Sequence, residues 1–344
     1  MPDNAQQAPN TPPPHVQMIQ MARGYFVSRI VYAAAKLGLP DQLAGSPKSA
    51  EEIAGPVGVQ ARSLHRLMRA LASQGILTEQ GEHRYGLTTL GETLTTGAFG
   101  SAKATVLTLC GPHFQDAWDH LVYSIQTGKT GFEKAHGMPL FDYLAQHPEE
   151  ASLFSETMAG FFSQEPPAVA AAYDFSVFKT IVDVGGATGT LLAEILTRHA
   201  GPRGVLFDRP YVVAEAPALL KNKGVNERVT IEAGDFFKTV PDGGDAYVLS
   251  HIIHDWSEDQ CLIILGHIRN AMNSNGRLLI VEMVLPEGDT PHPGILLDVA
   301  MLLFTGGQER TETEYRMLLS KAGFQLTRVA PTDSAVSIAE AVPA

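Results

Sequence analysis

The sequence predicts a two-part protein, in which a mostly helical winged-helix domain precedes an α/β domain built on a doubly wound, mostly parallel sheet. Three observations favour this fold class. The 344 residues exceed the usual size of one hydrophobic core. The N-terminal third is rich in helical patterns and holds one short hairpin. After Tyr173 continuous apolar strands alternate with amphipathic helices, which is typical of a doubly wound sheet.

The composition narrows the class of protein. Hydrophobic residues make up 44% and charged residues 18%, as in a globular chain, and no apolar run is long enough to span a membrane. Two cysteines give no disulfide framework and favour a reducing, cytoplasmic location. The polar, Pro-rich start lacks a signal-peptide pattern, so we expect a disordered tail over residues 1–14. The net charge of −12 argues against general nucleic-acid affinity, because phosphates are bound chiefly by Lys and Arg.

The first element is an apolar helix. Over residues 15–43 apolar side chains recur at helical spacing, with Gly38 and Pro40 as a stop signal. We expect so apolar a helix to be buried or to face a partner. The following stretch indicates a short helix, a Gly-Pro turn, a longer helix from about residue 62 to 73 and a hairpin, which is the order of a winged helix-turn-helix.

A winged helix can bind DNA, and Arg62, Arg66 and Arg69 on its longer helix would suit that function. The hairpin, however, carries Glu79 and Glu82, and no basic surface is predicted outside that helix. The sequence therefore favours packing or dimerisation. A ligand-responsive transcription regulator is kept as an alternative.

We place the winged-helix domain at residues 15–100, a helical connector at 101–172 and the doubly wound domain at 173–344. The connector carries an apolar stripe that can belong either to the core or to a ligand pocket. Large apolar residues most often lie inside, so the pocket interpretation needs a neighbouring site. The stripe consists of Phe154, Met158, Phe161 and Phe162.

Ligands of a doubly wound sheet bind at the carboxyl ends of its strands. The first strand runs into "IVDVGGATGTLL", a Gly-rich turn that opens a helix. Ala187 and Thr190 stand where a dinucleotide fingerprint needs glycine, and no G-x-x-x-x-G-K-[ST] phosphate loop is present. Small residues such as Gly185 instead allow a ligand to approach the backbone without a phosphate cradle.

The next two strands end in carboxylates. Asp208 ends the second strand, where it can accept both hydroxyls of a ribose. Asp235 follows the third, where it can accept from an adenine amino group while Phe236 lies against the ring. Together these ends indicate an adenosine without a pyrophosphate, for which S-adenosylmethionine is the common candidate.

The fourth strand ends in "HIIHDW", which raises the possibility of a metal site. Imidazole and carboxylate are ordinary ligands of zinc and iron. At the end of a strand, however, the spacing of three between His251 and His254 points their rings to opposite faces. We therefore expect no metal here.

Six motifs follow one another in order: "VDVGGATG", "GDFF", "HIIHDWSEDQC", "VEMVLPEG", "LLDVAML" and "GGQERTETEYRMLLSKAGF". They resemble the O-methyltransferase family that includes plant caffeate- and flavonoid-type enzymes and bacterial tailoring enzymes for aromatic natural products. The likeness runs from about residue 15 to the end of the chain. It implies a Rossmann-like methyltransferase domain behind a winged-helix dimerisation domain, a homodimer, and transfer of a methyl group from S-adenosylmethionine to a hydroxylated aromatic small molecule.

The resemblance also assigns individual residues. It implies S-adenosylmethionine contacts at Gly185, Asp208, Asp235, Phe236 and Ser250, the last at a position where plant members usually carry lysine. It identifies His254 as the catalytic histidine, flanked by the acids Glu282 and Glu309. It implies an acceptor pocket lined by Phe154, Met158, Phe161, Phe162, His251, Asp255, Asp298 and Met301.

The chemistry agrees with these roles. A phenol with a pKa of about 10 is mostly protonated at neutral pH, and a neutral histidine with a pKa of about 6.5 can remove that proton during attack. Such general-base catalysis contributes about 10² to 10⁴ in rate. A carboxylate on one ring nitrogen fixes the tautomer and leaves the other nitrogen free.

Two alternatives remain. Glu309 precedes a predicted helix and can be an ordinary helix N-terminal charge. The same fold can also use the bound cofactor for hydroxylation, decarboxylation or pericyclic steps.

Overall fold

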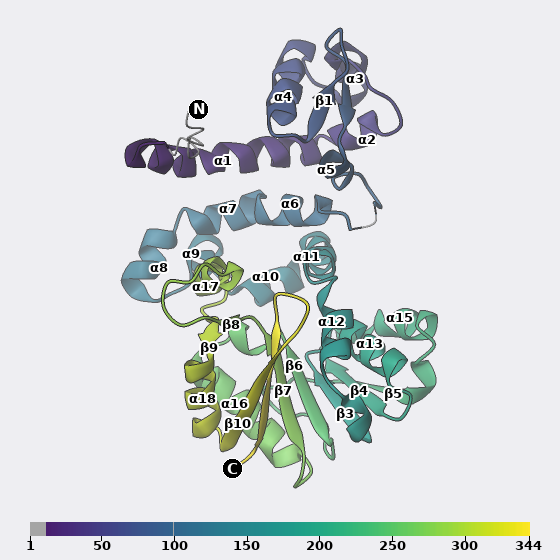
Figure 1. Cartoon of the computed structure of the whole chain (residues 1–344), viewed down its shortest axis with the longest axis vertical. Helices are drawn as coiled ribbons and strands as arrows, with labels where there is room; N and C mark the ends of the chain where they lie inside the picture. Colours follow the sequence, from purple (N-terminus) through teal and green to yellow (C-terminus); the bar gives the residue numbers. More distant parts are fainter. Residues whose placement is uncertain (1–11, 99) are drawn as a thin grey trace, which may run out of the picture. The chain divides into compact units, whose positions relative to one another are not determined.

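The computed structural model describes residues 12–98 and 100–344. Most of the expected N-terminal tail, residues 1–11, lies outside the described residues. The chain divides into two compact units, each described here by itself (Figure 1). Unit 1 comprises residues 1–115 and 147–161, and unit 2 comprises residues 116–146 and 162–344. The expected connector, residues 101–172, is thus shared between the units.

Unit 1 contains the predicted apolar helix and the winged helix. The long helix ends at Lys36, before Gly38 adopts a left-handed φ of +62°. Met68, Leu71 and Tyr85 are fully buried in the core that joins the hairpin to the helices. The elements are α1 (Pro14–Lys36), α2 (Leu39–Leu43), α3 (Ala50–Val57), α4 (Ala61–Ser73), β1 (Leu77–Glu79), β2 (Tyr85–Leu87) and α5 (Thr89–Glu92).

The rest of unit 1 and the start of unit 2 are helical, as predicted. Within unit 1, α6 packs against α11 through a buried hydrogen bond of 2.8 Å between the Thr108 and Thr157 hydroxyls. The helices are α6 (Lys103–Leu109), α7 (Pro112–Trp118), α8 (Leu121–Thr127), α9 (Gly131–His136), α10 (Leu140–Gln146), α11 (Pro148–Phe161) and α12 (Glu165–Ala172).

Unit 2 is built on a seven-stranded sheet of order β10-β11-β7-β6-β3-β4-β5 (Figure 1). β5, β4, β3, β6 and β7 are parallel, which confirms the predicted doubly wound sheet. β11 runs antiparallel to both β7 and β10, a C-terminal hairpin that the sequence analysis did not anticipate. The strands are β3 (Thr180–Val184), β4 (Arg203–Asp208), β5 (Val229–Ala233), β6 (Ala246–Ser250), β7 (Arg277–Glu282), β10 (Phe324–Pro331) and β11 (Ser337–Pro343).

Both faces of the central strands β3, β6 and β7 are buried. Successive strand residues point to opposite faces, so Ile181 packs with Leu192 of α13 in one core, and Val182 packs with Leu265 of α16 in the other. This explains why the strands are continuously apolar rather than alternating. The helices are α13 (Thr190–Arg198), α14 (Pro210–Val213), α15 (Ala216–Asn222), α16 (Glu258–Ala271), α17 (Pro293–Phe304) and α18 (Glu312–Lys321).

The strand order reverses between β3 and β6. From β3 the chain proceeds to β4 and β5 on one side, whereas β6 and β7 follow on the other. A crevice at the carboxyl end of two such strands is the usual ligand site of this fold. The short parallel pair of β8 (Val284–Leu285) and β9 (Arg310–Thr311) follows β7 and precedes α18.

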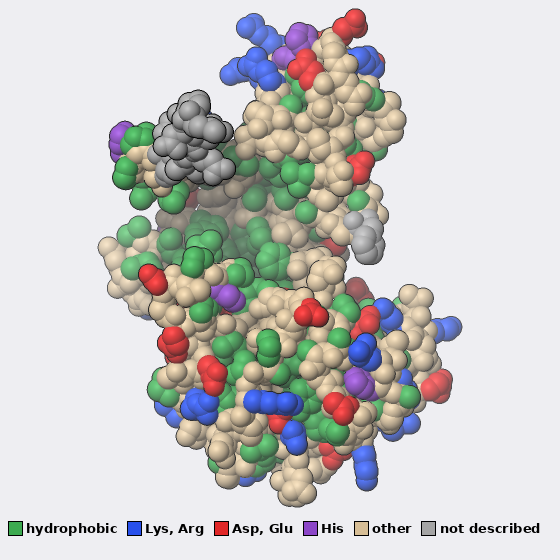
Figure 2. All heavy atoms as spheres, in the orientation of Figure 1, with side chains coloured by type: hydrophobic (Ala, Val, Ile, Leu, Met, Phe, Trp, Pro, Cys, Tyr) green, Lys and Arg blue, Asp and Glu red, His purple; other side chains and the backbone are tan. Residues whose placement is uncertain are grey.

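The surface charge of unit 1 is mixed. Arg84 pairs with Glu52 at 2.8 Å, and His83 pairs with Glu79 at 3.1 Å. Figure 2 shows basic, acidic and histidine side chains intermingled at the end of the unit that carries α3, α4 and the hairpin. This differs from the continuous basic face that phosphate binding requires. Among the helices described, none combines the length and apolar character of a membrane span.

Candidate active site

The loop after β3 packs closely on residues from two other strand ends. Gly185 has a φ of +72°, and a Cβ there would lie 2.4 Å from Ile252 Cδ1 and 3.6 Å from Phe236 Cε1. Only glycine fits such a position without displacing a neighbour. Gly189, with a φ of +82°, precedes α13 as its N-cap. The loop therefore presents bare backbone at the strand ends.

Asp208 ties the end of β4 to this loop. Its Oδ2 accepts the backbone N–H of Ala187 at 2.9 Å, and its Oδ1 accepts that of Arg209 at 2.6 Å. Burial raises the pKa of Asp208 despite these bonds. Each oxygen has a further lone pair, so the carboxylate can still accept from hydroxyl groups of a ligand.

An aromatic cluster lies beyond β5. The rings of Phe236 and Trp256 have centroids 6.0 Å apart and meet edge to face, and Phe141 lies 5.6 Å from the same Trp256 ring. Asp235 Oδ1 accepts the backbone N–H of Phe237 at 3.0 Å. Its other oxygen, Oδ2, lies 3.7 Å from Nζ of the exposed Lys238. Ser250 is the last residue of β6 and is half-buried. Bare backbone, carboxylates and aromatic faces at adjoining strand ends fit an adenosine-type ligand.

Asp183 lies under the loop and is fully buried. A Cβ on Gly186 would lie 2.5 Å from its carboxyl carbon. Burial and the nearby charge of Asp208 raise the pKa of Asp183 to about 7. The sequence places Asp183 in the motif "VDVGGATG", but it gave no sign that this carboxyl group would be fully buried.

His254 and Glu309 meet although 55 positions separate them. His254 Nδ1 lies 2.6 Å from Glu309 Oε1, and the two residues are only 5% and 3% exposed. An ionised carboxylate can only accept, so Nδ1 carries the hydrogen and Nε2 is left as the potential base. The nearest acid to Nε2 is Asp255, whose Oδ1 is 3.9 Å away and beyond hydrogen-bond reach.

The backbone around this pair is also fixed. Gln308 donates its N–H to the His254 carbonyl at 2.9 Å, and Glu309 donates its N–H to Asp298 Oδ1 at 2.9 Å. Glu282 accepts the backbone N–H of His254 at 3.1 Å. Both acids expected to flank His254 thus lie beside it: Glu309 bonds to its ring, and Glu282 bonds to its backbone N–H.

The expectation that His251 and His254 point to opposite faces is wrong. β6 ends at Ser250, His251 takes a left-handed φ of +54°, and the 3-10 turn η3 (Ile253–Asp255) follows. Strand alternation therefore no longer applies, and the two ring centroids lie 5.2 Å apart. Within the described ranges no group of three His, Cys, Asp or Glu residues is placed to hold a metal ion.

The acids around His254 change its expected protonation. Burial alone would lower the pKa of His254, but the charge of Asp255, the hydrogen bond to Glu309 and the charge of Glu282 outweigh it and raise the pKa to about 10. Burial raises the pKa of Asp255 to about 6, although the histidine opposes this. The neutral imidazole expected at pH 7 is therefore not the form that these charges favour.

The residues expected to line the acceptor pocket divide between the units. In unit 2, Phe162 stacks on His251 with centroids 3.9 Å apart, and Met301 is half-buried on α17. α11 ends at Phe161, so Phe162 lies beyond the helix that carries the rest of the stripe. The roles of the residues on α11 of unit 1 stay predictions; these are Phe154, Met158 and Phe161.

Three residues at the site were missed. Glu165 pairs with His251 at 2.6 Å, and the Tyr315 hydroxyl donates to Glu282. Arg310 is the one buried lysine or arginine among the described residues, and its Nη1 donates to the carbonyls of Ile253 at 3.2 Å and Gln308 at 3.1 Å. Of these three residues, only Arg310 could have been suspected from the sequence, because it directly follows Glu309.

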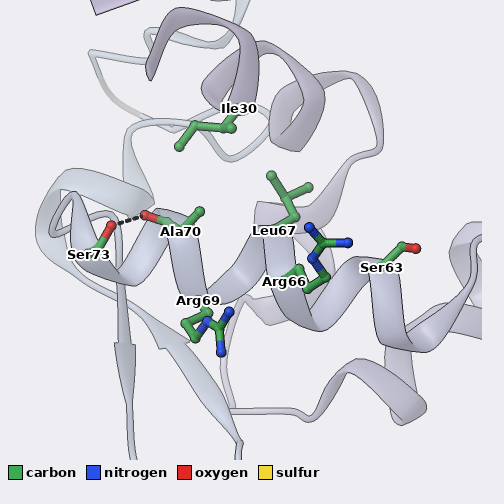
Figure 3. A pocket seen from close by; sticks show the side chains of 7 residues that line it. All are labelled: Ile30, Ser63, Arg66, Leu67, Arg69, Ala70 and Ser73. Carbon is green, nitrogen blue, oxygen red and sulfur yellow. Dashed lines mark hydrogen bonds between the residues drawn. The ribbon is translucent and has the colours of Figure 1, made fainter. Parts of the chain in front are cut away.

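An open hollow lies in unit 1. It is bordered by Ile30 of α1 and by α4, with the Ser73 hydroxyl bonded to the Ala70 carbonyl at 2.7 Å (Figure 3). Its lining brings no carboxylate or histidine together. We therefore place the chemistry at the strand ends and not in this hollow.

Comparison with known proteins gives a consistent result. Residues 118–325 match the family described as "O-methyltransferase domain", and residues 19–97 match "O-methyltransferase dimerisation domain". A phenazine O-methyltransferase of Lysobacter antibioticus is 44% identical over 326 residues, covering 95% of each chain. O-demethylpuromycin-O-methyltransferase of Streptomyces alboniger is 40% identical, covering 95% of this chain and 89% of that protein.

A solved structure also matches across most of the chain. It is an O-methyltransferase from neocarzinostatin biosynthesis, in complex with S-adenosylmethionine and 2-hydroxy-5-methyl naphthoic acid. The TM-score is 0.82 at 30% identity, covering 92% of this chain and 96% of that one.

Proposed function

The chain belongs to the O-methyltransferase family, and on this premise we propose that it methylates a hydroxyl group of an aromatic small molecule with His254 as the general base. It is an S-adenosylmethionine-dependent O-methyltransferase. The observation that carries the proposed mechanism is the buried hydrogen bond between His254 Nδ1 and Glu309, because it leaves Nε2 as the free nitrogen.

The loop and strand ends would hold the cofactor. Gly185 lets it approach the backbone, Asp208 accepts from its ribose hydroxyls, and Asp235 with Phe236 receives its adenine. S-adenosylmethionine supplies a methyl group on a positively charged sulfur. The task left to the protein is to orient the acceptor oxygen and to take its proton.

The acids around His254 set how that proton is held. Because they favour the charged imidazole, the acceptor hydroxyl and Nε2 must share a single proton before the oxygen can attack. The pair is then either a hydroxyl with a neutral imidazole or a phenolate with an imidazolium. Both forms have the same proton count, and in both the imidazole holds the proton once the bond between the oxygen and the methyl carbon has formed. Glu309 stabilises the second form and holds the ring in place.

The acceptor is proposed to be a hydroxylated aromatic compound. The names of the relatives specify a phenazine and O-demethylpuromycin, and the solved relative holds a naphthoic acid. In this chain the Phe162 ring beside His251 and the half-buried Met301 suit a flat apolar ring.

A screen tests this function. Purified protein, S-adenosylmethionine and a panel of hydroxylated phenazines, naphthols and benzoates are expected to yield products heavier by one methyl group. Equimolar S-adenosylhomocysteine should form, and NMR should place the new methyl on oxygen. Products of hydroxylation or decarboxylation without methyl gain, or methyl groups on nitrogen only, would contradict the proposal.

We further propose that the protein is a homodimer assembled through unit 1. α1 exposes an apolar face in which Met18, Met21 and Phe26 are 65%, 72% and 60% exposed. So large an exposed apolar surface normally marks an interface, and a hollow lined by both Phe26 of α1 and Ala70 of α4 adjoins it. Light scattering should give twice the chain mass, and Met21→Asp with Phe26→Asp should give a monomer. A monomeric wild type at micromolar concentration would count against this assembly.

A further inference from the structure

His251 and Glu165 form a second histidine–carboxylate pair beside the first. His251 Nε2 lies 2.6 Å from Glu165 Oε2, and the side chains are 13% and 10% exposed. Glu165 is the first residue of α12, where the helix dipole favours a negative charge. The proposed methyl transfer needs only one base, so this second pair requires an explanation of its own.

The ring of His251 is held in one orientation. Its residue has a left-handed φ of +54°, a conformation that side chains other than glycine rarely adopt. The backbone N–H donates to the Val281 carbonyl at 3.1 Å, which extends the β6–β7 pairing by one residue. Phe162 stacks on the ring at a centroid distance of 3.9 Å and an angle of 24°. These contacts hold the ring of His251 in a defined orientation.

Glu165 determines which nitrogen of His251 is free. The carboxylate can only accept, so Nε2 carries a hydrogen, and Nδ1 of the neutral ring keeps its lone pair. Nδ1 is buried and makes no hydrogen bond to any residue of the described ranges. Folded proteins pair nearly all buried polar atoms, so an unpaired one beside a reaction site points to a ligand as its partner.

We propose that His251 Nδ1 accepts a hydrogen bond from a second polar group of the acceptor, a hydroxyl or amino group ortho or peri to the hydroxyl that is methylated. The inference rests on the proposed function and specifies its substrate class. The ring centroids of His251 and His254 are 5.2 Å apart. Two imidazoles at that separation can both contact one aromatic acceptor, and a neighbouring pair of substituents is the arrangement proposed here.

Three naphthols provide the test: 2,3-dihydroxynaphthalene, 3-methoxy-2-naphthol and 2-naphthol. They differ only in the group beside the reacting hydroxyl, which is a donor, a methylated oxygen or hydrogen. We expect kcat/KM for the dihydroxy compound to exceed the others about 10-fold, beyond its statistical factor, because the others leave Nδ1 unpaired. The monomethyl product should therefore accumulate, since its second methylation lacks the donor.

Two variants test whether the pair of His251 and Glu165 causes this preference. His251→Phe keeps a flat ring against Phe162 and removes Nδ1, so the three substrates should converge to similar kcat/KM. Glu165→Gln offers Nε2 a donor as well as an acceptor, so Nδ1 is no longer fixed as an acceptor, and the preference should fall in the same direction. Glu194→Gln is the matched control. The Glu194 carboxylate pairs with Lys223 at 2.5 Å, and its loss should leave the wild-type ratio of kcat/KM values unchanged.

The outcomes separate the inference from the function on which it rests. If the wild type methylates all three naphthols equally well, or if the preference survives both variants, the inference is overturned and the methyltransferase function stands. If the wild type methylates none of them, the result counts against the proposed function itself. Should His251→Phe fail to fold, Glu165→Gln decides alone, and an unchanged ratio in that variant overturns the inference.

Discussion

Glu282 is joined to His254 through the backbone, and not through the imidazole ring. Glu282 Oε1 accepts the N–H groups of Ile252 and His254, each at 3.1 Å, and its Oε2 accepts the Tyr315 hydroxyl. Glu309 contacts the ring nitrogen Nδ1 instead. One acid therefore fixes the turn that carries the histidine, and the other fixes its ring.

Glu282→Ala is expected to act mainly on stability. It leaves two backbone N–H groups and the Tyr315 hydroxyl without an acceptor in a buried region, so the free energy of unfolding should fall by about 3 kcal/mol. Urea unfolding measures this. Glu309→Gln keeps an acceptor for Nδ1, and its loss should be mainly in turnover and smaller than that of His254→Ala. Equal destabilisation by both variants would contradict this division of roles.

The raised pKa of His254 predicts a pH dependence of stability. Burial alone would lower the pKa of His254, but Asp255, Glu309 and Glu282 raise it from 6.5 to about 10. The folded protein then binds this proton more tightly than the unfolded chain does, so the stabilising contribution is complete below pH 6.5 and is lost as the pH rises through about 10. The difference in the free energy of unfolding between the wild type and His254→Gln, measured by urea unfolding at pH 6, 8 and 10, should shrink steadily as the pH rises. A difference that stays constant with pH would contradict the shift.

The side of the site proposed for the cofactor follows from sequence pattern, because parallel strands place their carboxyl ends along one edge. Asp208 ends one strand, Gly185 and Asp235 follow two others, and these three strands are neighbours in the sheet. Glu165 had no such signal. It begins a helix 86 positions before His251, and only the tertiary fold brings the two together.

The orientation of the two histidines could not be predicted either. Strand alternation was assumed from His251 to His254, but β6 ends at Ser250 and His251 adopts a left-handed φ. The protonation of His254 likewise depends on acids from three separate segments. A reference pKa contains no information about such neighbours, so the neutral ring was the default expectation.

Asp208→Ala is expected to weaken cofactor binding. The variant loses the acceptor for ribose hydroxyls and the bond to the Ala187 N–H that orders the loop. Losing a charged hydrogen-bond partner typically weakens binding by about 10- to 100-fold. Titration calorimetry with S-adenosylhomocysteine measures this, with the exposed Asp242→Asn as control. Unchanged affinity in a folded Asp208→Ala protein would remove the residue from the cofactor site.

Gly307→Ala should damage turnover while sparing the cofactor. A Cβ at this position would lie 1.9 Å from the His254 carbonyl oxygen and 2.6 Å from the Asp255 carbonyl carbon, so the turn that carries the base must shift. Displacement of a catalytic group by about 1 Å can reduce rate about 100-fold. S-adenosylhomocysteine affinity should change little. Gly266→Ala on α16, where a Cβ meets nothing within 4 Å, is the control, and wild-type turnover in Gly307→Ala would contradict the argument.

His254→Ala tests the base itself. The cofactor contacts are assigned to other strand ends, so S-adenosylhomocysteine affinity should be nearly unchanged. Turnover of a phenolic acceptor at pH 7 should fall by about 10² to 10⁴. His83→Ala removes another histidine that pairs with a carboxylate, at 3.1 Å from Glu79, but on the exposed hairpin of unit 1, and should turn over as wild type does.

The dependence of this defect on the acidity of the acceptor separates base catalysis from a loss of shape. In the wild type the acceptor and His254 must together lose one proton to solvent, so kcat/KM should rise with pH and then level off. In His254→Ala the acceptor ionises alone, and the rate should climb until the pH passes the acceptor's own pKa. Because the pKa of His254 and that of a simple phenol are both about 10, these two profiles run nearly parallel. A phenol with a lower pKa ionises at pH 7 without a base, so the gap between the two enzymes should narrow as the acceptor becomes more acidic. A gap that is the same for acidic and for simple phenols would mean that the imidazole only positions the acceptor, and wild-type turnover by His254→Ala at pH 7 would remove it from the mechanism.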